Sequence, residues 1–240
     1  MHSHSYSYAK NESGNVILLV LIGIALFAAL SYAIMQSAGG SGKNADSETL
    51  RLETARLIEY ITSIRTAVTR LRYGKSCAPE EISFHYDSNG NGTVDGSDDY
   101  NNPNAPSDGS CNIFGRNGGG LTWLDYDNSD LPDLFGVVGF VFSGTIAVEE
   151  MGTPAPELTA RLFVSEEMCN RVNTELGLET GYFDTFSNGT YDEFLGTYSL
   201  ESTFGDESGS DRLPPNLPTA CFKRDNPQTQ YVFYAALLSR

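Results

Sequence analysis

The chain has 240 residues, which is enough for one folded domain and a small second piece. Its 15 Lys and Arg residues against 31 Asp and Glu residues give a formal net charge of −16, and this acidity argues against a nucleic-acid partner because an acidic surface repels phosphate. Hydrophobic residues make up 40% of the chain and aromatic residues 11%, which can fill a core and excludes wholesale disorder.

An uncharged apolar run lies near the start of the chain, from Val16 to Met35. A helix of this length spans about 30 Å, which is the thickness of a bilayer's hydrocarbon region. The run therefore predicts a membrane-spanning helix over residues 15–37, preceded by a polar, leader-like tail over residues 1–14. Two other interpretations stay open at this point: a buried core helix, and a secretory signal that is cleaved at residues 37–39.

The next segments predict a joint and a second helix. Residues 38–46 are rich in Gly and Ser and are expected to form a flexible hinge. An amphipathic stem helix is expected over residues 47–74, because its apolar positions recur at alternating spacings of four and three, which brings them to one face. These positions are Leu50, Thr54, Leu57, Ile61, Ile64, Val68 and Leu71. The stripe is suited to pack on the protein's own domain or against neighbouring subunits.

The short polar segment that ends in Gly14, the apolar run after it and the stem together cover roughly residues 10–75. This part of the chain resembles type IV pilins and pseudopilins. The resemblance implies processing after Gly14, with Asn15 as the first mature residue. Most members carry a Glu five residues into the mature chain, where this sequence has Leu19. It further implies a structural subunit of a surface filament or secretion assembly that self-associates through its N-terminal helix.

Beyond the stem, the pattern changes to short β-type segments. Strands are expected at residues 82–86, 120–124, 137–142, 159–164 and 231–238. One helix is expected between them, with Ser165 as its N-cap and Gly177 after its last turn. The predicted fold class is α+β, in which a long N-terminal helix, membrane segment plus amphipathic stem, packs on a mainly antiparallel β-sheet domain over residues 75–240.

Four cysteines follow the apolar run, and none of them forms a CxxC motif. The simplest of the three possible pairings joins nearest neighbours in sequence, Cys77 with Cys111 and Cys169 with Cys221. Four reduced thiols in a cytosolic domain are the alternative. Disulfides favour an exported domain, so we expect a single-pass membrane protein with an extracytoplasmic C-terminal domain at the cell surface or in a filament.

Residues 87–98 read DSNGNGTVDGSD and match the order of an EF-hand-type calcium loop. The expected ligands are Asp87, Asn89, Asn91, the carbonyl of Thr93, Asp95 and Asp98. Gly92 takes the position of the sharp turn. Asp98 closes the loop where classical EF-hands have Glu, which resembles the dockerin variety of the loop. Oxygen ligands of this kind suit calcium, and the alternative is an acidic surface loop that binds nothing.

The sequence offers no support for catalysis, because it has three histidines and no GxSxG, HExxH or phosphate-loop motif. We therefore expect a non-enzyme: a pilin-like structural subunit, associated with a membrane and with other subunits, that is stabilised by calcium and disulfides. The alternatives are a membrane-anchored binding module such as an adhesin or receptor domain, a viral membrane or particle protein, and an anchored or secreted hydrolase.

Overall fold

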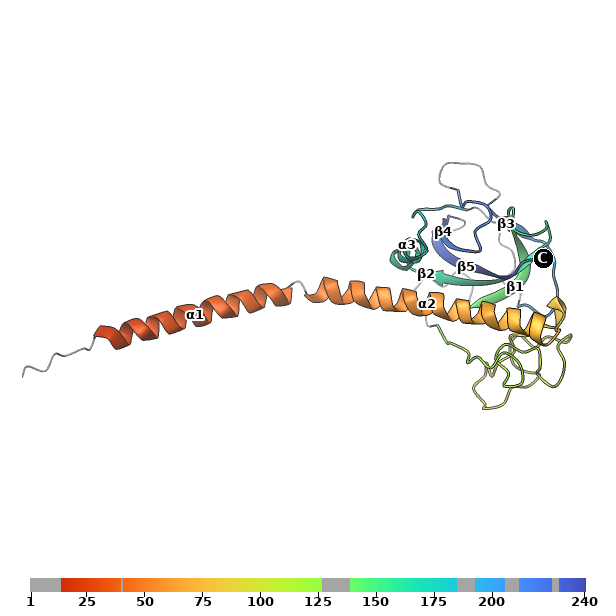
Figure 1. The fold of residues 1–240 in the computed structure, drawn as a ribbon, viewed down its shortest axis with the longest axis horizontal. Coiled ribbons are helices and arrows are strands. Elements are labelled where there is room, and N and C mark those ends of the chain that lie inside the picture. The colour runs from red at the N-terminus through yellow and green to blue at the C-terminus, as the bar shows by residue number, and fades with distance from the viewer. Residues whose placement is uncertain (1–13, 40, 127–138, 185–192, 206–211, 226–228) are drawn as a thin grey trace, which may run out of the picture. The chain divides into compact units, whose positions relative to one another are not determined.

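The computed structural model describes residues 14–39, 41–126, 139–184, 193–205, 212–225 and 229–240. In this part of the chain, three α-helices and five strands follow one another in the order α1, α2, β1, β2, α3, β3, β4, β5 (Figure 1). A short 3-10 turn, Pro79–Glu81, comes after α2. The chain forms two compact units, residues 1–49 and residues 50–240, and each is treated by itself below.

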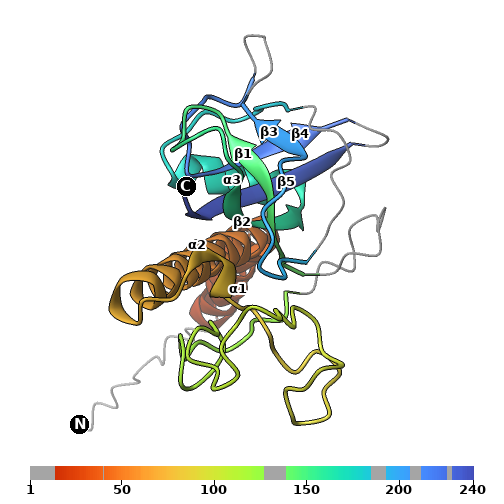
Figure 2. The same ribbon diagram turned by 90° about the vertical axis from the view of Figure 1, so that its right-hand side faces the viewer.

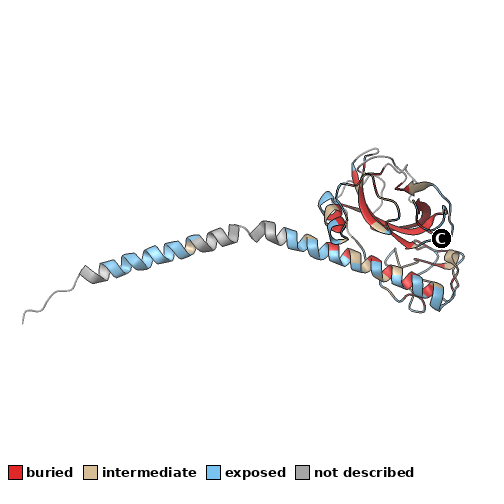
Figure 3. Cartoon of the chain, turned by 45° about the horizontal axis from the view of Figure 1, so that its top comes forward, coloured by how far each residue is buried: buried red, intermediate tan, exposed pale blue. Residues whose placement is uncertain are grey.

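Helix α1 (Gly14–Gly39) exposes apolar side chains in every direction, as the pale blue colour of its central turns in Figure 3 illustrates. Between residues 18 and 32 the large apolar side chains are 48% to 72% exposed: Leu18, Leu19, Val20, Leu21, Ile22, Ile24, Leu26, Phe27, Leu30 and Tyr32. A helix that is hydrophobic on all sides is normally buried. Nothing within the described part of its own unit covers these side chains.

The predicted membrane-spanning helix over residues 15–37 is wrong. No helix among the described residues is long and apolar enough to cross a membrane. The single-pass membrane localisation that depended on this helix is corrected with it.

Helix α2 (Ser41–Gly74) begins two residues after α1 ends, within the predicted hinge 38–46. Its predicted apolar stripe is buried: Leu57, Ile64, Val68 and Leu71 are 0% exposed and Ile61 is 2% exposed. In Figure 3 buried and exposed positions alternate around this part of the helix. The heptad spacing in the sequence thus identified the buried face of α2 correctly.

The described strands form one sheet in the order β3-β1-β2-β5-β4. Their bounds are Val141–Val148 for β1, Glu157–Val164 for β2, Ser202–Phe204 for β3, Thr219–Arg224 for β4 and Gln230–Leu238 for β5. The pairs β1–β2, β2–β5 and β4–β5 are antiparallel, whereas β1–β3 is parallel. The sheet is therefore mixed.

The predicted fold class needs correction in two respects. Helices α1 and α2 are separate, and neither qualifies as the expected membrane segment in the described residues. The expected mainly antiparallel sheet is mixed, because β3 joins the β1 edge in parallel. The predicted strands 82–86 and 120–124 are not part of it, and Ser83 makes only an isolated bridge with Asn112. Aromatic packing holds the first segment instead, since Phe84 stacks on Phe142 with ring centroids 4.0 Å apart.

Two hydrophobic clusters lie in the domain. The larger contains the buried stripe of α2, α3 (Glu166–Glu175) and sheet residues such as Phe142 and Phe233. The smaller contains Phe204, Phe222 and Tyr234, whose rings pack edge to face or tilted with centroids 4.9 to 5.9 Å apart. In Figures 1 and 2 the loops of residues 77–126 extend beyond α2 on the side opposite the sheet.

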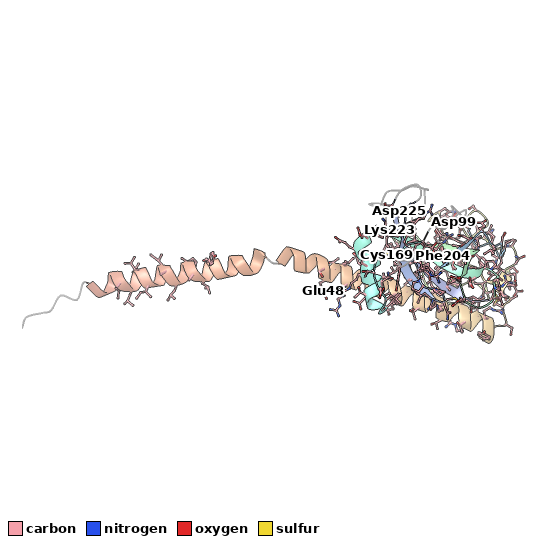
Figure 4. The ribbon with its side chains drawn as sticks, turned by 90° about the horizontal axis from the view of Figure 1, so that it is seen from above. Glu48, Asp99, Cys169, Phe204, Lys223 and Asp225 are labelled. Atoms are coloured by element: carbon pink, nitrogen blue, oxygen red, sulfur yellow. A yellow bond between two sulfur atoms is a disulfide. The ribbon has the colours of Figure 1, made fainter. Side chains whose placement is uncertain are left out.

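The predicted disulfide pairing is confirmed. Cys77 is bonded to Cys111 and Cys169 to Cys221, and the described chain contains no free cysteine. The first bond closes the base of the excursion that carries the predicted calcium loop. The second joins α3, where Figure 4 labels Cys169, to β4. Two disulfides are consistent with an extracellular protein.

Candidate metal site

The predicted calcium loop leaves the domain after a short extended segment. Ser83 exchanges backbone hydrogen bonds with the segment 111–113, and Tyr86 stacks on Trp123 with centroids 3.8 Å apart. At the far end Tyr100 is buried and its hydroxyl contacts the backbone of Phe142 and Phe140 at 3.2 Å. Packed aromatic side chains therefore hold both ends of the loop.

The first half of the loop folds around Asp87. Its carboxylate accepts hydrogen bonds from the backbone N–H of Asn91 at 3.0 Å and of Gly92 at 2.7 Å. The amide oxygen of Asn89 accepts a second bond from the Asn91 N–H at 3.0 Å. Gly92 has a φ of 86°, in the left-handed region that favours glycine, so the predicted sharp turn is confirmed at this position.

The second half is organised by Asp98, which is 6% exposed. Its carboxylate accepts from the backbone N–H of Asp95 at 2.8 Å, of Ser88 at 3.1 Å and of Asn89 at 3.3 Å. These bonds connect the two ends of the loop through one side chain. They also lower the pKa of Asp98, with the bond from Asp95 as the largest cause, so the group is a carboxylate at neutral pH.

Asp95 forms a tight turn of its own. Its carboxylate accepts from the hydroxyl of Ser97 at 2.6 Å and from the Ser97 N–H at 2.9 Å, and these bonds lower its pKa. The carbonyl of Asp95 lies 2.7 Å from Nε2 of His85. Sequence reasoning missed the parts played by Ser88 and Ser97, although a Ser two residues after an Asp is a typical sign of such a turn.

The backbone N–H of Asp95 donates to the carboxylate of Asp98 at 2.8 Å, and the carboxylate of Asp87 binds the opposite part of the loop. Within the described residues no three His, Cys, Asp or Glu side chains are grouped as they would be around a metal ion. The other predicted ligands are the amide oxygens of Asn89 and Asn91 and the carbonyl of Thr93, which are not among these four residue types. Calcium binding at residues 87–98 therefore stays a prediction.

Two other predictions concern residues at the limits of the described ranges. Gly14 and Asn15, the predicted processing site, are in the first turn of α1, and the tail over residues 1–13 is outside the described residues. The predicted strand 137–142 lies partly outside them, and its described end leads into β1.

Comparison with protein-family models, with curated proteins and with solved structures finds no match for this chain. The likeness to pilins and to dockerin-type calcium loops therefore rests on the residues quoted above.

Proposed function

We propose that this protein is a structural, pilin-like subunit that self-associates through α1 and carries its disulfide-bonded domain outside the cell. The exposure of the apolar side chains of α1 is the observation that carries the proposal. Each square ångström of apolar surface in water costs about 25 cal/mol, so ten large apolar side chains favour association strongly. Because the helix is apolar on all sides, several neighbouring helices are needed to cover it, as in the core of a filament.

Small residues on α1 support close packing of such helices. Gly23, Ala25, Ala28 and Ala29 lie within the exposed stretch, and the position that a Cβ on Gly23 would occupy has no other atom within 4 Å. Small side chains allow helix backbones to approach closely, which increases van der Waals contact between them. The same helix thus offers both large apolar side chains and places into which they fit.

Calcium in the loop 87–98 is the second part of the proposal. Two features support it: the order of oxygen-bearing residues in the sequence, and the lowered pKa values of Asp95 and Asp98, which keep both groups negatively charged. A bound cation would neutralise charge in a domain that is strongly acidic. The ion would have a structural role, stiffening an excursion whose base the Cys77–Cys111 disulfide closes.

Self-association is tested with the full-length protein in aqueous buffer, by sedimentation velocity and negative-stain electron microscopy. Leu26→Glu introduces a charge on α1, where Leu26 is 66% exposed. Leu52→Glu is the matched control on α2, where Leu52 is 52% exposed. We expect elongated assemblies for the wild type and for Leu52→Glu, and monomers for Leu26→Glu, because only α1 contributes to the assembly core.

A monomeric wild type would overturn the proposal. Equal loss of assembly in both variants would also contradict it, since association would then depend on general surface hydrophobicity and not on α1.

A further inference from the structure

A cleft of about 840 Å³ lies beside the loop 87–98, and its lining consists of described residues only. Three segments form it: part of the loop with the residues before it, residues 101–109, and residues 112–123. Its volume is in the range of sites that hold ligands of drug size or larger. The assembly surface proposed above is on α1 and does not include this cleft, whereas two of the proposed calcium ligands, Asp87 and Asp95, line it.

Aromatic side chains form a rigid part of the lining. Trp123 stacks on Tyr86 with an interplanar angle of 7° and meets Phe114 edge to face with centroids 5.3 Å apart. All three side chains are half-buried, so part of each stays accessible. Since packing fixes their orientation before a ligand arrives, a ligand that rests on them loses little free energy in ordering the protein.

Three hydrogen-bond donors in the cleft make no hydrogen bond to another described residue. They are the indole N–H of Trp123, the hydroxyl of Tyr86 and the guanidinium of Arg116, which is exposed. Carboxylate oxygens of the loop supply acceptors, and the cleft therefore offers both halves of a hydrogen bond next to apolar rings.

The charges around the cleft disfavour anions as ligands. Its carboxylates are Asp87, Asp95 and Asp108. Hydrogen bonds from Ser110 lower the pKa of Asp108, so this group is ionised at neutral pH and repels an anion. Arg116 on the same cleft compensates the charge of one of the three carboxylates. A neutral molecule that has flat apolar C–H faces and a rim of hydroxyl groups matches this combination.

We infer that the cleft beside the loop 87–98 binds a neutral oligosaccharide, with a sugar ring against the Tyr86–Trp123 pair and its hydroxyls bonded to Arg116 and the loop carboxylates. Sugar rings combine the two features that the lining requires. They present C–H groups on one face and bear hydroxyls that both donate and accept hydrogen bonds.

Trp123 gives the test a direct signal, because it is the single Trp of the chain. The full-length protein, with calcium in excess, is titrated with neutral oligomers of glucose, mannose, galactose and N-acetylglucosamine while Trp emission is recorded. Chitosan oligomers, the cationic counterpart of the N-acetylglucosamine series, and oligogalacturonate, an anionic series, are run beside them. We expect a saturable change with at least one neutral series and at least tenfold weaker binding of the anionic series.

Variants at exposed positions distinguish an effect on ligand binding in the cleft from an effect on folding. Arg116→Ala removes a donor, and Ser107→Leu fills space in the cleft; both residues are exposed and line it. We expect Arg116→Ala to weaken binding about tenfold, the loss expected for a hydrogen bond to a charged group. We expect Ser107→Leu to weaken binding because the larger side chain excludes part of the ligand. Arg56→Ala, an exposed Arg on α2, should bind as the wild type does. Leu26→Glu should also bind normally, so failure here is distinguishable from failure of the assembly proposal.

Three results would overturn the inference: no saturable change with any neutral series, tighter binding of a charged series, or unchanged binding by both Arg116→Ala and Ser107→Leu.

Discussion

Helices α1 and α2 follow each other in sequence but differ in the burial of their apolar side chains. In α2 the apolar residues lie on one face and are buried in the core of their own domain, with Leu57 and Ile64 0% exposed. In α1 they lie on every face and stay exposed. One face of a helix can be covered by one domain, whereas a helix that is apolar all round needs neighbours on all sides. The comparison assigns α2 to the core of the domain and leaves α1 as the helix through which we propose that the protein assembles.

Removing the Cys169–Cys221 bond should weaken the domain most while leaving α1 untouched. The double change Cys169→Ser and Cys221→Ser releases a closure of 52 residues, for which the chain-entropy account gives a loss of about 4 kcal/mol. Urea unfolding of the domain measures this loss. At urea concentrations below its unfolding transition, the variant should still sediment as an assembly. Loss of the assembly would contradict the division of roles between α1 and α2.

Shortening one buried side chain on α2 tests the comparison within a single residue type. Ile64→Ala should lower the free energy of unfolding by about 3 kcal/mol, because the residue is fully buried and its removal leaves a cavity. Ile24→Ala is the matched change on α1, where the side chain is 61% exposed. It should leave the urea midpoint of the domain unchanged and reduce assembly instead. Equal losses of domain stability in the two variants would refute the division.

A buried carboxyl group makes the stability of the domain depend on pH. Glu157 is 0% exposed, one carboxylate oxygen accepts from the backbone N–H of Val148 at 2.8 Å, and the other has no hydrogen-bond partner in the described residues. Burial raises its pKa to about 7 from an ordinary value of 4.5. The folded state therefore holds the proton more tightly than the unfolded state, and this stabilisation, present below pH 4.5, is lost as the pH rises to about 7.

The expected loss between these pH values is at most about 3 kcal/mol. Glu157→Gln should abolish this part of the pH dependence and be more stable than the wild type at pH 8, as measured by urea unfolding at both ends of the range. Glu166→Gln, at an exposed position on α3, is the control and should keep the wild-type profile. If the free energy of unfolding of Glu157→Gln changed with pH as much as that of the wild type, groups other than Glu157 would cause the pH dependence.

Calcium should give the smallest of these effects. A calcium concentration ten times the Kd adds about 1.4 kcal/mol to the folded state, which corresponds to a rise of a few degrees in Tm. The rise should vanish in EGTA and in Asp87→Ala, which removes a carboxylate from the loop. Asp225→Ala removes an exposed carboxylate elsewhere, one that pairs with Lys223 at 2.9 Å (Figure 4), and should keep the rise. If calcium did not change the Tm of the wild type, the proposed calcium site at residues 87–98 would be refuted.

Local patterns in the sequence were reliable where a few neighbouring residues contain the whole physical cause. The buried face of α2 follows from the heptad spacing. The start of α3 follows from Ser165, whose hydroxyl accepts from the Met168 N–H at 3.2 Å. The turn at Gly92 follows from the freedom of glycine at positive φ. The two disulfides also agree with the simplest pairing, that of nearest neighbours in sequence.

Features that depend on distant partners were not readable in this way. Apolar and polar residues alternate over residues 82–86 as they do in a strand. The segment is nevertheless held by the stacking of Phe84 on Phe142, 58 positions later, and not by strand pairing. The parallel pairing of β3 with β1 and the meeting of Tyr86 with Trp123 are of the same kind. Periodicity records which face of a segment is apolar, but not which segment covers it. Tertiary packing makes that choice, and it created both the mixed sheet and the cleft beside the loop.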